Sequence, residues 1–272
     1  RDLRASAGSR NHRSALVPVH AEGTAVPLIF VHPIGGDVLC YSGLGQRLRK
    51  DQPFYALQSR DRTEEKPTLE ELAADYARAI RQDVPGSRYR LGGWSMGGVL
   101  AMELARELES QGCVIDVVIA IDVLEGPSQL RRPLGGRKSL LSWLGRDLAG
   151  LTGLPWFPGD GAFDSPSELF ESLRSQGVLP TDIDPTEFDT VFARFESNAR
   201  ALHGYHPKPF DGSVYFLRAE SGATFQAAED WRSVCQGRFE EIVVPGDHYT
   251  VLNSANVDAV ASSIRSILAR PS

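Results

Sequence analysis

The chain has 272 residues, a length that suits one large domain or two small ones. Hydrophobic residues make up 42% and charged residues 24%, which argues against a disordered, collagen-like or coiled-coil protein. A duplex-binding protein needs a basic face, and the net charge of -6 gives no indication of one. No run approaches the roughly 20 apolar residues that span a bilayer. We therefore expect a globular protein that uses neither nucleic acid nor membrane as a partner.

The cysteines and the first residues indicate the cellular compartment and the context of the chain. Cys40, Cys113 and Cys235 are odd in number and widely spaced, so we expect no disulfide framework and predict a reducing, cytoplasmic location. The chain opens without the apolar core of a signal peptide and without a Met. We interpret the polar, Arg-rich residues 1–14 as a linker, and the chain as a piece of a longer protein.

Short apolar runs then alternate with segments of helical periodicity. We predict strands over 27–32, 54–58, 89–94 and 117–121, and helices over 68–84 and 96–110. Thr68 and Glu71 form a capping-box pattern at the start of the helix over 68–84. Alternating strands and helices predict an α/β fold, with a mostly parallel sheet covered by helices on both faces.

The alternation stops over 124–204, where helical patterns recur and no segment is typical of a strand. Ser165-Pro166 and Asp184-Pro185 each place a capping residue before a Pro at the first helical position. Strands over 214–217 and 241–244 and helices over 225–234 and 257–268 follow. We therefore predict a core over 15–123 and 205–272, with a helical insertion over 124–204.

The insertion is rich in aromatic residues, which we expect first to form its own core. Some of them are expected to line a substrate pocket, although the sequence does not say which. The set comprises Trp143, Trp156, Phe157, Phe163, Phe170, Phe188, Phe192 and Phe195.

The strongest chemical signal is Gly-Trp-Ser-Met-Gly at 93–97, between a predicted strand and a predicted helix. A Gly-x-Ser-x-Gly motif in that context is typical of a nucleophile elbow. The glycines leave room for the sharp turn, and the Ser95 hydroxyl is presented at the carboxyl edge of the sheet, where such sheets bind ligands. The alternative is an ordinary strand–turn–helix in which Ser95 only caps the helix.

A serine hydroxyl needs a base to take its proton. In α/β-hydrolases the chain order is serine, acid, histidine, and the histidine lies after the last strand. Of the six histidines, His248 alone has this place. His203 and His206 are three residues apart, but no third ligand is evident, so we predict no metal site.

The acid that orients the histidine has several candidates. Asp122 ends the strand after the nucleophile helix, while Glu220 and Asp230 follow the next strand. Asp247 adjoins His248, but neighbouring side chains in a short loop seldom face each other. Position alone favours Asp122 over Glu220 and leaves Glu220 open.

A tetrahedral intermediate needs backbone donors for its oxyanion. One donor is expected to be the N–H of Met96, directly after the serine. The second is expected from the His-Pro-Ile-Gly-Gly loop at 32–36, where Ile34 is the first choice and Gly35 the alternative. His32 itself is interpreted as an anchor of this loop.

These segments together resemble the thioesterases that release products from nonribosomal peptide synthetases and polyketide synthases. The matching segments are Val-His-Pro-Ile-Gly-Gly at 31–36, Tyr-Ala-Leu-Gln at 55–58, Leu-Gly-Gly-Trp-Ser-Met-Gly-Gly at 91–98, Ile-Asp at 121–122, Val-Tyr-Phe-Leu-Arg-Ala at 214–219 and Val-Pro-Gly-Asp-His-Tyr at 244–249.

The resemblance implies an α/β-hydrolase fold with a mobile helical lid between the sixth and seventh core strands. It implies Ser95 as the acylated nucleophile, His248 as the base and Asp122 as its partner, which favours Asp122 further over Glu220. It also implies that the N–H groups of Ile34 and Met96 form the oxyanion hole.

The resemblance further implies a substrate, which is an acyl or peptidyl thioester on the phosphopantetheine of an upstream carrier domain, and no cofactor of the chain's own. Release by water would give an acid, and attack by an amine or hydroxyl of the same chain would give a macrocycle. The alternatives are a stand-alone editing thioesterase or carboxylesterase, or a non-catalytic hydrolase-fold module that only binds a carrier.

Overall fold

A computed structural model describes residues 15–48, 50–60, 66–154, 158–159, 161–222 and 225–270. The predicted linker over 1–14 lies outside the described residues, as do Trp156 and Phe157.

The described residues form one seven-stranded sheet in the order β1-β3-β2-β4-β5-β6-β7. Strand β1 is antiparallel to β3, and every other pair is parallel. This confirms the prediction of a mostly parallel sheet. The strands are β1 Leu16–His20, β2 Leu28–Val31, β3 Phe54–Leu57, β4 Arg88–Trp94, β5 Val114–Ile121, β6 Val214–Ala219 and β7 Phe239–Val244.

Strand β1 was not predicted. Among the described strands it lies at the edge of the sheet and pairs with β3, and it contains the exposed Pro18 opposite Tyr55. A proline has no N–H for a ladder hydrogen bond, so it is tolerated at an edge and weakens the local strand pattern.

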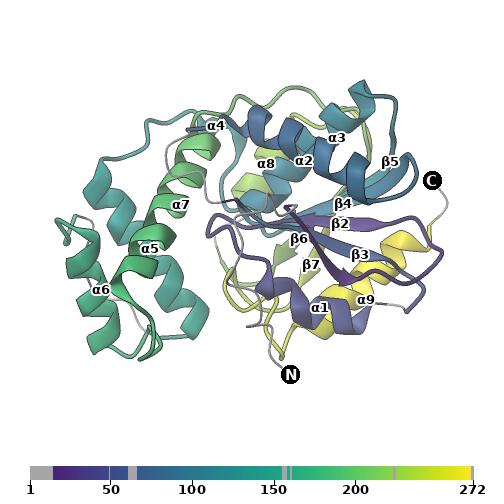
Figure 1. Cartoon of the computed structure of the whole chain (residues 1–272). Coiled ribbons are helices and arrows are strands. Elements are labelled where there is room, and N and C mark those ends of the chain that lie inside the picture. The colour runs from purple at the N-terminus through teal and green to yellow at the C-terminus, as the bar shows by residue number, and fades with distance from the viewer. Residues whose placement is uncertain are drawn as a thin grey trace.

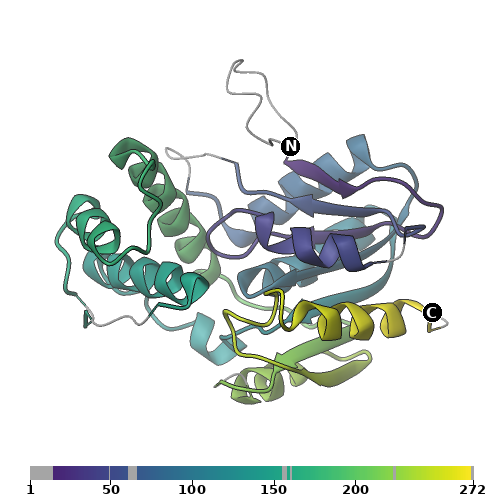
Figure 2. The same cartoon turned by 90° about the horizontal axis from the view of Figure 1, so that it is seen from below.

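Helices cover both faces of the sheet, as predicted (Figures 1 and 2). One face carries α1 Ser42–Arg47 and α9 Val257–Leu268, and the short 3-10 helix η1 Leu39–Tyr41 precedes α1. The other face carries α2 Leu69–Asp83, α3 Met96–Ser110 and α8 Phe225–Arg232. Strand β5 supplies both faces because its side chains alternate: Ile119 joins the α1/α9 cluster, and Val118 and Ala120 join the other.

The local sequence explains several of the helix starts. The Thr68 side chain accepts a hydrogen bond from the Glu71 N–H at 3.2 Å, and the Glu71 carboxylate accepts from the Thr68 N–H at 2.8 Å. This is the predicted capping box of α2. Ser165 and Asp184 cap the two insertion helices that begin at Pro166 and Pro185.

Four helices lie between β5 and β6 in the described part of the insertion: α4 Pro127–Leu130, α5 Arg137–Thr152, α6 Pro166–Ser175 and α7 Pro185–His203. The expectation of a lid between the sixth and seventh strands is therefore wrong for this chain, because five of the described strands precede the insertion and two follow it.

The insertion is not a separate body. Its buried side chains share one hydrophobic cluster with α2 and α3, and Figure 1 shows α5, α6 and α7 beside the sheet rather than on either helical face. Its buried aromatic residues are Phe163, Phe170, Phe188, Phe192 and Phe195. Every helix in the described residues is too short or too polar to cross a bilayer.

Candidate active site

Ser95 occupies a sharp turn between β4 and α3, with φ 58° and ψ −129°. A positive φ at a residue other than glycine costs about 1–3 kcal/mol and persists only where the surroundings hold it. Here the Ser95 N–H donates to the Ile121 carbonyl at 2.8 Å. A Cβ on Gly93 would lie 2.4 Å from the Gly97 carbonyl carbon, and one on Gly97 would lie 2.3 Å from the Val31 oxygen. The motif glycines therefore let the strand, the turn and the helix approach this closely.

Asp122 reaches the same edge of the sheet from the neighbouring strand. Trp94 and Ile121 are paired across β4 and β5, so the residues that follow them, Ser95 and Asp122, leave the sheet side by side. Asp122 is fully buried. Its Oδ1 accepts from the Ala219 N–H at 2.8 Å, which fixes the direction of the carboxylate.

His248 lies in the loop after β7 and meets this carboxylate. Its Nδ1 is 2.9 Å from Asp122 Oδ2, although the two residues are 126 positions apart. The imidazole also contacts the Trp94 ring, with centroids 5.0 Å apart. The structure thus brings His248 to Asp122 and to the residue before Ser95, and the Nδ1–H to carboxylate bond leaves Nε2 to act as a base.

The alternative acids are exposed or have other partners. Glu220 is exposed, and Asp230 accepts from the Ser128 hydroxyl at 2.8 Å. The Asp247 carboxylate accepts from the N–H groups of Tyr249 and Thr250 within its own turn. Among the described residues, Asp122 is the carboxylate that the structure places on the His248 imidazole.

Ser95 opens onto a cavity of about 360 Å³, a size within the usual range for small-molecule sites. Ile34 and Met96 line this cavity, whereas the alternative donor Gly35 does not. The N–H of Met96 begins α3, where the first helical N–H groups have no acceptor inside the helix. The two residues proposed for the oxyanion hole therefore flank the same space as the serine.

The rest of the cavity wall is mainly apolar and comes partly from the insertion. Trp143 is the predicted aromatic residue that lines it. The apolar side chains are those of Val99, Val123, Leu124, Leu130, Trp143 and Leu202, and the polar ones are those of Glu125, Ser139, Arg146 and Tyr249.

His203 pairs with Glu125, one of these polar residues. Its Nε2 lies 3.1 Å from Glu125 Oε2. Although burial opposes the charge, the Glu125 carboxylate raises the pKa of His203 above its usual value. The described residues contain no group of three His, Cys, Asp or Glu side chains that could hold a metal ion.

His32 anchors its loop, as expected. A carbonyl can only accept, so the Nδ1 of His32 donates to the Pro33 carbonyl at 2.7 Å. Its Nε2 therefore accepts from the Tyr76 hydroxyl at 2.7 Å. Complete burial lowers the pKa of His32 to about 4, which keeps the ring neutral at pH 7.

Several supporting residues were not identified from the sequence. The Tyr41 hydroxyl donates to the Val31 carbonyl at 2.6 Å and accepts from the Trp94 N–H at 2.9 Å, which ties two strand ends together beside the elbow. On α5, the buried Asp147 accepts a hydrogen bond from the Tyr249 hydroxyl. Nothing local in the sequence marks either residue.

Two further residues, Arg194 and Asn198, project from α7 to the 32–36 loop. The sequence pattern could have identified Asn198, because it is a polar residue on the helix face that also carries the buried Phe195 and Leu202.

Comparisons with known proteins indicate the family of the chain. A family model described as a thioesterase domain matches residues 26–268. A dimodular nonribosomal peptide synthase of Bacillus subtilis (strain 168) is 28% identical over 250 residues, which are 88% of this chain and 10% of that protein. The chain thus spans about a tenth of the length of this curated relative.

Solved structures show the same fold. Holo-AB3403, a four-domain nonribosomal peptide synthetase bound to AMP and glycine, matches with a TM-score of 0.83 and 28% identity, over 95% of this chain and 20% of that one. The NocB thioesterase domain, in covalent complex with a fluorophosphonate nocardicin G analog, matches with a TM-score of 0.68 and 23% identity, over 94% of this chain and 100% of that one. These similarities confirm the α/β-hydrolase-like architecture.

Proposed function

The chain belongs to the thioesterase domain family, and from this premise we propose that it releases an acyl or peptidyl chain from a carrier-bound thioester through an acyl-enzyme on Ser95. The observation that carries the proposal is the bond of 2.9 Å between His248 and the buried Asp122, beside the strained serine turn. A buried carboxylate that orients an imidazole near a serine hydroxyl that opens onto a cavity is the arrangement that makes serine a nucleophile.

In the proposed reaction, His248 Nε2 takes the Ser95 hydroxyl proton as the oxygen attacks the thioester carbonyl. The N–H groups of Ile34 and Met96 stabilise the resulting oxyanion. Collapse of the tetrahedral intermediate breaks the carbon–sulfur bond, and the thiol leaves with the proton from His248. Asp122 stays ionised and holds the imidazole in its Nδ1–H tautomer.

A second nucleophile then attacks the acyl-enzyme, again with His248 as the base. Water yields a carboxylic acid, and an amine or hydroxyl of the bound chain yields a macrolactam or macrolactone. The chain then acts as an acyl transferase as well as a thioesterase. Both outcomes share the Ser95 ester, so the same residues serve both.

The cavity wall supports an acyl chain with a substantial apolar part. Its lining combines apolar side chains of the core, such as Val99 and Val123, with Trp143 and Leu202 of the insertion. An apolar wall next to the reacting carbonyl also limits the access of water.

We further propose that the substrate is delivered on the phosphopantetheine of an upstream carrier domain, and that the chain needs no cofactor or metal of its own. The support is that this chain matches 20% of the length of a similar synthetase, and that synthetase has four domains. Within the described part of the chain the three cysteines are unpaired, which is consistent with the proposal of a reducing compartment.

A fluorophosphonate tests the acyl-enzyme directly, and the NocB domain is known as a covalent complex with such a reagent. Intact-mass measurement should show one added phosphonyl group on the wild type and none on Ser95→Ala. An unmodified wild-type protein would instead favour the non-catalytic, carrier-binding alternative.

A second assay separates the thioesterase from a carboxylesterase. Turnover of an acyl-N-acetylcysteamine thioester should exceed that of the matching oxygen ester, whereas the reverse preference would favour the carboxylesterase. The masses of products from linear peptidyl thioesters then distinguish hydrolysis from cyclisation.

A further inference from the structure

The loop over 32–36 is held at three successive carbonyl oxygens by side chains. The Pro33 carbonyl accepts from His32 Nδ1 at 2.7 Å. The Ile34 carbonyl accepts from Asn198 Nδ2 at 2.8 Å, and the Gly35 carbonyl accepts from Arg194 Nε at 3.0 Å. This loop contains both candidate donors for the second place in the oxyanion hole, the N–H groups of Ile34 and Gly35.

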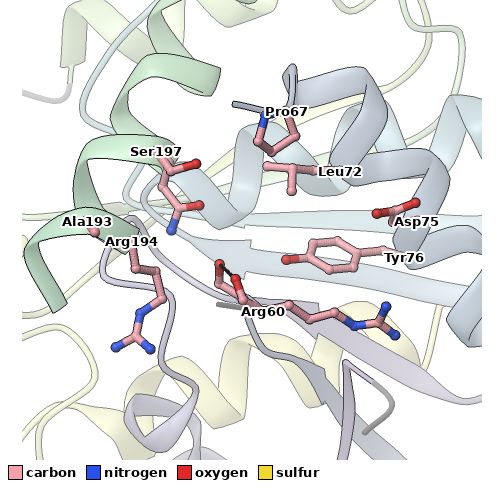
Figure 3. A pocket seen from close by; sticks show the side chains of 10 residues that line it. Arg60, Pro67, Leu72, Asp75, Tyr76, Ala193, Arg194 and Ser197 are labelled. Atoms are coloured by element: carbon pink, nitrogen blue, oxygen red, sulfur yellow. Dashed lines mark hydrogen bonds between the residues drawn. The ribbon is translucent and has the colours of Figure 1, made fainter. Parts of the chain in front are cut away.

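Two of these three donors come from α7 of the helical insertion rather than from the sheet. Asn198 and Ile34 are 164 positions apart in the chain, and Arg194 and Gly35 are 159 apart. Figure 3 shows Arg194 and Ser197 on α7, across a narrow gap from Leu72 and Tyr76 of α2. The cavity between the two helices is only about 20 Å³, too small for a substrate group.

Asn198 and Arg194 of α7 pack closely against the 32–36 loop. Asn198 is 2% exposed, and a buried amide without partners would cost about 1–3 kcal/mol, so its bond to the loop matters to the fold as well. The Arg194 side chain lies across Gly36, where an added Cβ would come within 2.6 Å of Arg194 Cδ. Gly36 has φ +82°, a conformation that favours glycine.

Peptide planarity connects these contacts to the oxyanion hole. In a trans peptide the C=O and the N–H point in opposite directions, so fixing one fixes the other. His32 holds the Pro33 carbonyl and so directs the Ile34 N–H, whereas Asn198 holds the Ile34 carbonyl and so directs the Gly35 N–H. The two side chains therefore fix Ile34, the donor that lines the cavity, from both of its peptide bonds. The Gly36 N–H still closes the turn onto the Pro33 carbonyl at 2.9 Å without Asn198, but the central peptide between Ile34 and Gly35 loses the hydrogen bond that directs its oxygen away from the developing oxyanion.

We propose that Asn198, supported by Arg194, is a positioning residue for the oxyanion hole, so that the helical insertion sets part of the catalytic geometry as well as the pocket. The inference rests on the proposed function, because it assumes that an oxyanion forms at Ser95. It predicts that the correct docking of α7 is a condition for the chemical step, since a displacement of about 1 Å at a reacting group can cost about 100-fold in rate.

The test uses Asn198→Leu, which keeps the size of the side chain and removes the donor, and Arg194→Met, which keeps the half-buried stem. Ser197→Ala, on the same helix and lining the same small cavity, is the matched control. The probe substrate is octanoyl-N-acetylcysteamine thioester, and heptyl trifluoromethyl ketone serves as the inhibitor, because its adduct with Ser95 carries the same oxyanion. Thermal unfolding shows which variants are folded.

We expect kcat of Asn198→Leu to fall about 10- to 100-fold with KM changed less than about threefold, because an oxyanion-hole donor acts only in the transition state. Inhibition by the trifluoromethyl ketone should weaken by the same factor as kcat/KM. Arg194→Met should show a smaller fall in kcat, again with little change in KM. If Asn198→Leu does not fold, the kinetics of Arg194→Met provide the test instead. Ser197→Ala should match the wild type.

A folded Asn198→Leu with unchanged kcat would overturn the inference, as would a raised KM with unchanged inhibition by the ketone, which would indicate a role in the pocket only. If Asn198→Leu does not fold, wild-type kinetics in Arg194→Met would overturn it equally. A wild-type protein that turns over no thioester would instead overturn the proposed function, and the inference would fall with it.

Discussion

The replacement of Asp122 by Asn tests whether Asp122 is the acid that orients His248, because it exchanges one carboxylate oxygen for an NH₂ group. Asp122 has φ 43°, a region in which Asn is tolerated about as well as Asp, so the backbone should be retained. The amide oxygen must take the place of Oδ1, because that atom accepts from the Ala219 N–H at 2.8 Å. The amide NH₂ then faces His248 Nδ1, which lies 2.9 Å from the present Oδ2.

An NH₂ group can only donate, so it forces His248 Nδ1 to accept and moves the ring proton to Nε2. Nε2 is the atom that must take the Ser95 proton, and in this tautomer it cannot. In serine triads the corresponding change lowers kcat by about 10⁴-fold, equivalent to about 5 kcal/mol in the activation barrier. We expect a loss of that order for Asp122→Asn at pH 7, with unfolding close to that of the wild type.

The assay is thiol release from octanoyl-N-acetylcysteamine thioester, with Glu220→Gln as the control. Glu220 is exposed and follows the neighbouring strand, so its variant should keep wild-type kinetics. If Asp122→Asn keeps more than a tenth of wild-type kcat, or if only Glu220→Gln is crippled, Asp122 is not the acid and the tautomer reasoning is refuted.

Three stability predictions follow from the packing around the site, each measured by urea unfolding. Gly97→Ala should lose at least about 2 kcal/mol and most activity, because its Cβ would lie 2.3 Å from the Val31 oxygen; wild-type stability would contradict this. Burial lowers the pKa of His32 from 6.5 to about 4, so the unfolded chain takes up a proton first as the pH falls. From pH 7 to pH 5 the wild type should therefore lose about 2 kcal/mol relative to His32→Asn, and parallel pH profiles would refute the shift. Burial raises the pKa of Asp147 from 3.8 to about 6, so the unfolded chain releases its proton first as the pH rises. Between pH 4 and pH 7 the wild type should lose about 2 kcal/mol relative to Asp147→Asn, and a constant difference between the two would argue against a buried acid.

The central elements could be predicted because their signals are local. The capping pair Thr68 and Glu71 starts α2 where the pattern places it, and helix α3 over Met96–Ser110 has the predicted bounds. The glycines around Ser95 indicate a close turn because short-range steric limits act within a few residues. The edge strand β1 was missed since Pro18 interrupts its pattern and its partner β3 lies far along the chain.

The order of the parts along the chain also indicated where the site residues would lie. Ser95 and Asp122 follow consecutive parallel strands, and such strands present their carboxyl ends at one edge. The sequence could rank Asp122 above Glu220 on this basis, but it could not place either carboxylate on His248. That contact depends on the register of β5, β6 and β7 and on the course of the loop after β7.

By itself, then, the sequence determined the elements, the serine turn and the set of residues able to do the chemistry, because backbone sterics and hydrophobic periodicity are short-range effects. The tertiary structure decided which of these residues meet. It paired His248 with Asp122 and brought α7 of the insertion onto the 32–36 loop. Contacts such as that of Asn198 with Ile34 form between segments more than a hundred residues apart, and the burial of a common core, which no local pattern records, brings those segments together.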